Sequence, residues 1–501
     1  MSTSRRTPWA VFRRSDRWTW ALSGVLFAVI CVMTPEIYRD WRSTELLRMG
    51  GHSTNPAEAM AYLDEVRSLV SHREKLRQPL LAAYNGQAVR LDKLGKADLA
   101  ADFFERALRL DPDNPLVLKN YAVSINNRAV ELSTAGEYGR SQKLFERATE
   151  ALSGVQPTSV HDQVRLNYSA LLTVWGQDLL KKGQDNAALQ AFTQASQLST
   201  TNTAALAALG DMAYDSNKFA SAKQFYGQCI AIAPEQFQQL SARLDMIRGE
   251  LAVDASLDSV DFADPSFHLQ VPTGTDPQTS QRLAAVLAET RKYVEAVLGL
   301  QVVRTVNVRV FPSQDFYRIS QLPEWAVGSF DGKIRLKVED IAGDGRHLAN
   351  LLAHELAHAI IGGHMQAEVP AWFHEGIAQL CEPYAEESTR GAAFRNRKLL
   401  AILRDSKPVL GQQVSFKELT QREDADTAYL IAKSFVAYLV QVRGDEVLRQ
   451  LIRELRGTDP FETQFQKVYG RSLLAMETEW RESMNQGTAP RPRGANPSPQ
   501  R

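Results

Sequence analysis

Cysteine is scarce in this sequence, and neither sign of charge predominates. The 501 residues include 3 cysteines and equal numbers of basic and acidic residues, 58 of each, so the formal net charge is zero. Cys31, Cys229 and Cys381 lie far apart, and their spacing implies no disulfide framework. Because Lys and Arg are dispersed rather than gathered in a basic domain, the sequence argues against a nucleic-acid partner.

Charge is also absent from residues 18–35, an apolar run near the N-terminus. A helix rises about 1.5 Å per residue, so this run nearly spans a hydrocarbon core of ~30 Å. Arginines crowd residues 1–17, whereas the basic residues after the run are partly offset by acidic ones. The positive-inside rule then places residues 1–17 in the cytoplasm and the rest of the chain outside it. We expect an uncleaved, single-pass transmembrane signal anchor, because no A-x-A cleavage site follows the run; a removable signal peptide and a buried soluble helix are the alternatives.

Helical repeats follow this run. Residues 81–114 carry a turn glycine, small packing residues, an aromatic residue and a closing proline, in that order. The frame recurs three more times, and the last two copies are 34 residues apart. Its markers include Gly95, Ala100, Phe104 and Pro112 in the first copy, Gly136 and Phe145 in the second, Gly183 and Phe192 in the third, and Ala222, Tyr226 and Pro234 in the fourth. The pattern resembles the tetratricopeptide repeat, which implies an all-α solenoid of about four helix pairs over residues 81–236.

Two interpretations of these repeats stay open. Tetratricopeptide arrays usually bind a protein segment in their groove, so the resemblance implies a protein partner or presentation of a substrate; a simple spacer is the alternative. Around the repeats we expect a helical linker at residues 36–80 and a capping helix with a linker at 237–257. The tail at 486–501 is rich in Pro, Arg, Gly and Ser. We expect it to be disordered, because it buries too little apolar surface to offset its chain entropy.

The motif with the clearest chemistry is H-E-x-x-H at His354, Glu355 and His358. Residues four apart share one face of a helix, so both imidazoles can reach one ion while Glu355 lies beside it. Two neutral histidines are zinc ligands, and a catalytic site leaves one position for water, whose proton the carboxylate can accept. The motif predicts one zinc ion per chain. The alternative is a buried amphipathic helix with two hydrogen-bonded core histidines.

Two residues compete to be the third ligand. His364 has the offset of the third histidine in the metzincin pattern, but Ile361 occupies the position where that pattern needs glycine. Glu375 lies in the stretch Pro-Ala-Trp-Phe-His-Glu-Gly-Ile-Ala at residues 370–378. We expect the glycines at 362–363 to end the first helix, and a second helix beginning near residue 370 to turn Glu375 back towards the metal.

H-E-x-x-H followed by W-x-x-E-G resembles the gluzincin peptidases, and specifically the bacterial peptidase-MA-like domains. The resemblance covers roughly residues 257–485 and implies an α+β zincin-like domain over 258–485. It extends to predicted strands at 267–271, 306–311 and within 325–338, and to predicted helices at 279–298, 345–361 and 428–439. By this resemblance His354, His358 and Glu375 are the zinc ligands and Glu355 is the general base.

Several polar residues near the motifs have open roles. Tyr429 is a candidate donor to a tetrahedral oxyanion, with a helix-packing role as the alternative. Gln379 shares a face with Glu375 and could orient a ligand histidine, although a plain surface position is favoured; Glu382 or Glu368 could take that role instead. The residues expected to lie outside the ligand set are His364, His374 and Cys381, the last as a small buried apolar group.

These features predict a membrane-anchored zinc metallopeptidase that hydrolyses peptide bonds. The bacterial resemblance implies an inner-membrane anchor, with the C-terminal domains in the periplasm. A strand at the sheet edge, residues 334–338, is a candidate to align an extended peptide by backbone pairing. Two other functions stay open: a catalytically idle tetratricopeptide scaffold, and a zinc amidase acting on cell-wall linkages.

Overall fold

The computed structural model describes residues 16–70, 74–262, 264–322, 329–365, 369–384, 397–401, 403, 410, 422–457 and 459–486, without the side chains of 16–23, 26–35, 329 and 422–425. The described chain divides into two compact units. One comprises Met1–Trp175 with Gln194–Asn202, and the other comprises Gly176–Thr193 with Thr203–Arg501. The first unit is helical, and the second combines helices with one sheet.

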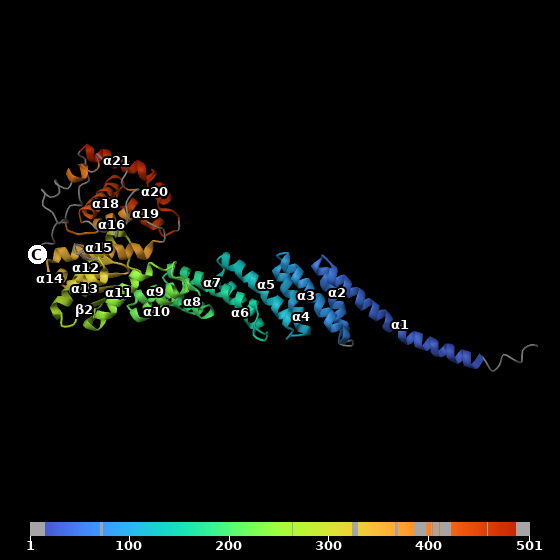
Figure 1. The fold of residues 1–501 in the computed structure, drawn as a ribbon. Helices are drawn as coiled ribbons and strands as arrows, with labels where there is room; N and C mark the ends of the chain where they lie inside the picture. Colours follow the sequence, from blue (N-terminus) through green and yellow to red (C-terminus); the bar gives the residue numbers. More distant parts are fainter. Residues whose placement is uncertain are drawn as a thin grey trace, which may run out of the picture. The chain divides into compact units, whose positions relative to one another are not determined.

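Successive helix pairs form at all four predicted repeats (Figure 1). Their helices are α3 (Arg77–Lys93) and α4 (Ala97–Leu110), α5 (Pro115–Thr134) and α6 (Tyr138–Leu152), α7 (Ser159–Lys181) and α8 (Asp185–Leu198), and α9 (Thr203–Asp215) and α10 (Phe219–Ile232). Gly95, Gly136 and Gly183 lie between paired helices with φ near +70 to +77°. Only glycine adopts that backbone readily, which explains the glycine in the repeat frame.

Two helices precede the repeats: α1 (Asp16–His52) and α2 (Pro56–Val70). Among the helices of the described part of the chain, none has both the length and the apolar character needed to cross a bilayer. The predicted anchor at 18–35 falls within α1, but apart from Gly24 and Val25 its side chains lie outside the described residues. The anchor therefore stays a prediction. The predicted disordered tail lies outside the described residues beyond Gln486.

The second unit contains a mixed five-stranded sheet of order β1-β2-β3-β5-β4. Its strands are β1 (Leu257–Val260), β2 (Phe267–Pro272), β3 (Val306–Phe311), β4 (Ser329–Phe330) and β5 (Lys333–Lys337). β2, β3 and β5 are parallel, whereas β1 and β4 pair antiparallel with their neighbours. The strand predicted at the sheet edge, residues 334–338, corresponds to β5. The first half of β5 is not at the edge, because β4 pairs with Ile334 and Arg335.

The two faces of this sheet differ in chemistry. On one face Leu269, Val308 and Leu336 join the apolar core with helices α12 (Pro277–Leu298) and α15 (Gly345–His364). On the other face Arg309 and Arg335 are fully buried although they are charged. The fourth repeat pair and α11 (Leu240–Val253) cover that polar face: Tyr214 of α9 and Glu250 of α11 bond to Arg335, and Phe219 of α10 lies against Arg309. The fourth repeat is therefore part of the same compact unit as the sheet.

Helices complete the unit on the apolar side of the sheet (Figure 1). They are α14 (Val338–Ala342), α16 (Ala371–Leu380), α18 (Arg422–Arg443), α19 (Asp445–Glu454), α20 (Phe461–Tyr469) and α21 (Leu473–Asn485), while α13 (Ser313–Ser320) contacts α11. The glycines at 362–363 do not end the metal helix, since α15 runs on to His364, whereas α16 begins at Ala371 as predicted.

Candidate metal centre

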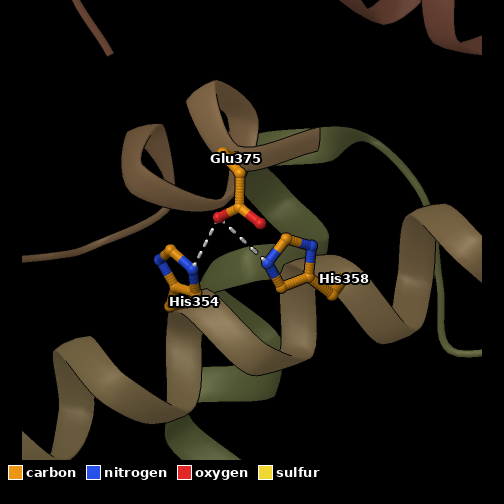
Figure 2. Close-up of side chains that lie close together, drawn as sticks. All are labelled: His354, His358 and Glu375. Carbon is orange, nitrogen blue, oxygen red and sulfur yellow. Dashed lines mark ion pairs between the residues drawn. The ribbon is translucent and has the colours of Figure 1, made fainter. Parts of the chain in front are cut away.

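Two histidines on α15 face a glutamate on α16. His354 and His358 lie one helical turn apart, with ring centroids separated by 4.9 Å. Oε2 of Glu375 lies 3.3 Å from Nε2 of His354 and 3.5 Å from Nε2 of His358, as Figure 2 shows. One ligand atom from each of the three residues lies within 4.8 Å of the other two. Two motifs on separate helices thus meet at one point.

The chemistry of this point fits a metal ion. Oε2 of Glu375 is buried and makes no hydrogen bond, although two imidazoles lie within ion-pair distance. Burial alone would raise the pKa of this carboxyl group, but His354 and His358 outweigh burial and hold the pKa well below its ordinary value. A carboxylate with two imidazole nitrogens is a donor set of zinc hydrolases, and it leaves one coordination position open. The three residues therefore form a candidate metal site.

Glu382 orients His354 from the ring edge opposite the Nε2 atom that faces Glu375. Its Oε1 lies 3.1 Å from Nδ1 of His354, and its Oε2 accepts a hydrogen bond from Nζ of Lys433 at 3.2 Å. A proton on Nδ1, shared with the carboxylate, leaves Nε2 unprotonated and able to bind a metal. Burial would raise the pKa of Glu382, but His354 and Lys433 lower it below its ordinary value, so the carboxylate is ionised.

Gln379 does not take that role. Its Nε2 donates a hydrogen bond to the backbone oxygen of Tyr429 at 3.0 Å, which ties α16 to α18. The prediction that Gln379 is a plain surface residue is therefore wrong, because its side chain is half-buried between the two helices. Of the two alternatives named from the sequence, Glu382 makes the contact with His354, and Glu368 lies outside the described residues.

Glu355 lies between the two histidines on α15 and is buried. Burial raises the pKa of its carboxyl group, and the neighbouring His354 and His358 oppose that shift. Tyr429 lies close by, with its ring centroid 6.3 Å from that of His354. Burial first, and then the charges of Glu375 and Glu355, raise the pKa of its phenol, so the hydroxyl keeps its proton at neutral pH and can donate it in a hydrogen bond.

The remaining candidates lie outside the ligand set. Nε2 of His364 is 2.8 Å from the backbone oxygen of Gln301, so this histidine is occupied elsewhere. The ring centroid of His374 is 6.1 Å from that of His358, and burial lowers its pKa to about 4, so it is neutral at neutral pH. Cys381 is buried in the apolar core, as predicted. Within the described residues the three-residue group is the one cluster of His, Cys, Asp and Glu able to hold an ion.

Two parts of the chain match known families. Residues 323–486 match the Peptidase MA superfamily, and residues 81–114 and 203–236 match the tetratricopeptide repeat. The chain thus carries a Peptidase MA superfamily domain preceded by tetratricopeptide repeats, as the motifs predicted. A search of curated proteins finds no match to this chain. The matched stretch 323–486 includes all three residues of the candidate metal site.

Proposed function

We propose that this chain is a zinc-dependent peptidase with its active site at His354, His358 and Glu375. The observation that carries the proposal is the convergence of these three ligand atoms, within 4.8 Å of one another, inside a Peptidase MA superfamily domain. The substrate class follows from that family match: a peptide or protein.

The residues around the site have separable tasks in hydrolysis. His354, His358 and Glu375 would hold a zinc ion, and its Lewis acidity would polarise a carbonyl group and lower the pKa of water towards ~7. Glu355 accepts a proton from the attacking water and passes it to the leaving amine. Glu382 keeps the imidazole of His354 in the required tautomer. The hydroxyl of Tyr429 donates a hydrogen bond to the oxyanion that develops on the former carbonyl oxygen.

The repeats and residues 18–35 have roles of their own. The repeats bind a protein partner or the substrate, which the tetratricopeptide match supports by analogy of fold. Residues 18–35 anchor the protein in the bacterial inner membrane with the peptidase domain in the periplasm; their support is the uncharged run and the arginines before it. Protease accessibility of the C-terminal domain in spheroplasts, with and without detergent, tests this placement.

Replacement of Glu355 by Gln tests the mechanism. The variant should bind zinc as the wild type does, since Glu355 is not a ligand, yet lose about 10²- to 10⁴-fold or more in hydrolysis of a peptide pool. Full activity of Glu355→Gln would refute the proposed base. Zinc-loaded wild type that cleaves cell-wall fragments and no peptide would identify an amidase, and one that cleaves neither would favour the scaffold.

A further inference from the structure

The turn between β4 and β5 rests on the fourth repeat. The hydroxyl of Tyr214, near the end of α9, donates a hydrogen bond to Oδ2 of Asp331 in that turn, at 2.8 Å. The tyrosine side chain is completely buried. A helix of the repeat region therefore makes a direct, solvent-excluded contact with the hairpin at the end of the peptidase sheet.

Gly332 shows how closely the repeat approaches the turn. Its φ is +103°, a backbone conformation that residues with a side chain rarely adopt. A Cβ atom at this position would lie 2.9 Å from Oδ1 of Asp215, the last residue of α9. Nζ of Lys333, the next residue, donates to the backbone oxygen of Tyr214 and lies over the tyrosine ring. The end of α9 and the hairpin turn thus fit against each other.

Arg335 joins this contact to α11. Its guanidinium donates to Asp331 at 2.6 Å, to the hydroxyl of Tyr214 at 2.6 Å and to Oε1 of Glu250 at 2.8 to 2.9 Å. Both Arg335 and Glu250 are fully buried. In a low-dielectric environment, hydrogen bonds between charged groups are stronger and more directional than at a surface. The hairpin is therefore held in one position by groups from outside the family-matched segment.

The same hairpin lies beside the metal helix. β4 is the outermost strand at that end of the sheet and contacts α15, and Phe330 packs on the apolar core to which α15 contributes. A displacement of the hairpin would consequently move the sheet edge relative to Glu355.

We propose that Tyr214 of the fourth repeat is a positioning residue for hydrolysis: by holding Asp331, it fixes the β4–β5 hairpin as the edge along which an extended substrate is aligned beside α15. This inference rests on the proposed peptidase function. The fourth repeat then serves the active site directly, in addition to any docking role of the repeats before it. Because Tyr214 touches neither substrate nor ligand, its loss should weaken substrate alignment and spare the chemical step.

The structure offers a matched control in the same helix pair. Tyr226 on α10 is also completely buried, and its hydroxyl donates to an aspartate, Asp211, at 2.5 Å. That bond lies within the repeat and touches no strand. Tyr214→Phe and Tyr226→Phe therefore remove the same atom from similar surroundings, but only the first change removes a hydrogen bond to Asp331, whose bond from Arg335 remains.

The experiment compares both full-length variants with wild type in peptide hydrolysis and in zinc affinity. Tyr214→Phe should raise KM about three- to tenfold, less than complete loss of a hydrogen bond to a charged group would give, because Arg335 still donates to Asp331; kcat should stay within about twofold and zinc affinity unchanged. Tyr226→Phe should match wild type in all three. Equal KM values for the two variants would overturn the inference.

A second measurement does not depend on turnover. Amide hydrogen exchange of residues 329–337 should accelerate in Tyr214→Phe and remain at the wild-type rate in Tyr226→Phe. Unchanged exchange in Tyr214→Phe would overturn the positioning role, even if the melting temperature fell. A wild type that binds zinc and hydrolyses no peptide would instead refute the proposed function, while accelerated exchange in Tyr214→Phe would still support the coupling of Tyr214 to the hairpin.

Discussion

Oε1 of Glu382 lies 3.1 Å from Nδ1 of His354, on the ring edge opposite the Nε2 atom that faces Glu375. Loss of the carboxylate charge should weaken the bond to Nδ1, so that the imidazole is held less firmly in the tautomer that leaves Nε2 able to bind a metal. We therefore expect Glu382→Gln to weaken zinc binding about 10- to 100-fold, measured by competition with a chelator. Glu446→Gln, at an exposed carboxylate on α19, is the control and should bind zinc as wild type does. Wild-type zinc affinity in Glu382→Gln would contradict the role of Glu382.

The identity of the third ligand can be tested by metal analysis. Glu375→Ala removes the oxygen that faces both imidazoles, so the purified variant should contain little or no zinc. His364→Ala should keep about one zinc per chain, because that histidine bonds to the backbone of Gln301 instead. Loss of zinc in the His364 variant alone would place the site in a different class of zinc peptidase.

The buried charges on the sheet should matter more for stability than any surface ion pair. Glu250 lies 2.8 Å from both Arg309 and Arg335, and all three side chains are fully buried. Glu250→Gln leaves the guanidinium groups without their shared counter-ion, so unfolding free energy should fall by about 3 to 5 kcal/mol. Urea denaturation followed by circular dichroism measures the change. Glu446→Gln, which removes an exposed pair with Arg453, should leave the midpoint unchanged.

Gly376 should tolerate no side chain. A Cβ atom there would lie 2.5 Å from Cγ2 of Val436 and 2.7 Å from the backbone oxygen of Ala432, both on α18. Because backbone atoms cannot give way easily, Gly376→Ala should cost about 1 to 3 kcal/mol and move the adjacent Glu375, which would weaken zinc binding. Thermal unfolding and chelator competition measure the two effects.

The control for Gly376→Ala is Gly362→Ala on α15, where a Cβ atom would meet nothing within 4 Å. Replacement of a helical glycine by alanine at an open position is neutral or stabilises by about 0.4 to 1 kcal/mol. An equal loss of stability in both variants would show that the glycine in W-x-x-E-G is not there for close helix approach.

The histidine pair and the repeat pairs could be predicted from sequence because each depends on local spacing, whereas Glu375, on a second helix, was expected at the candidate site through the family resemblance. His354 and His358 share a helix face whatever surrounds them. The end of α15 could not be predicted in this way: a helical glycine costs only about 1 kcal/mol, so Gly362 and Gly363 weaken a helix without ending it. The choice between Gln379 and Glu382 also depends on structure, since Glu382 follows the end of α16 and is aimed by the chain turn rather than by helical periodicity.

The polar face of the sheet was the least predictable feature. Alternation of charged and apolar residues in β5 is typical of a strand with one face in water. Here Lys333 and Arg335 are fully buried, because helices more than 80 residues earlier in the chain supply Glu250 and Tyr214 as partners. No local pattern in β5 indicates those partners.

The buried arginines also limit how this architecture can diversify. Repeat proteins commonly gain and lose repeats by duplication or deletion of whole helix pairs, because each pair packs mainly on its neighbours. Deletion of α9 and α10, however, would expose Arg309, Lys333 and Arg335 on the sheet and remove Tyr214 from the hairpin turn. Loss of an earlier repeat would leave these buried charges covered, whereas the fourth repeat and the sheet can be kept or lost only together.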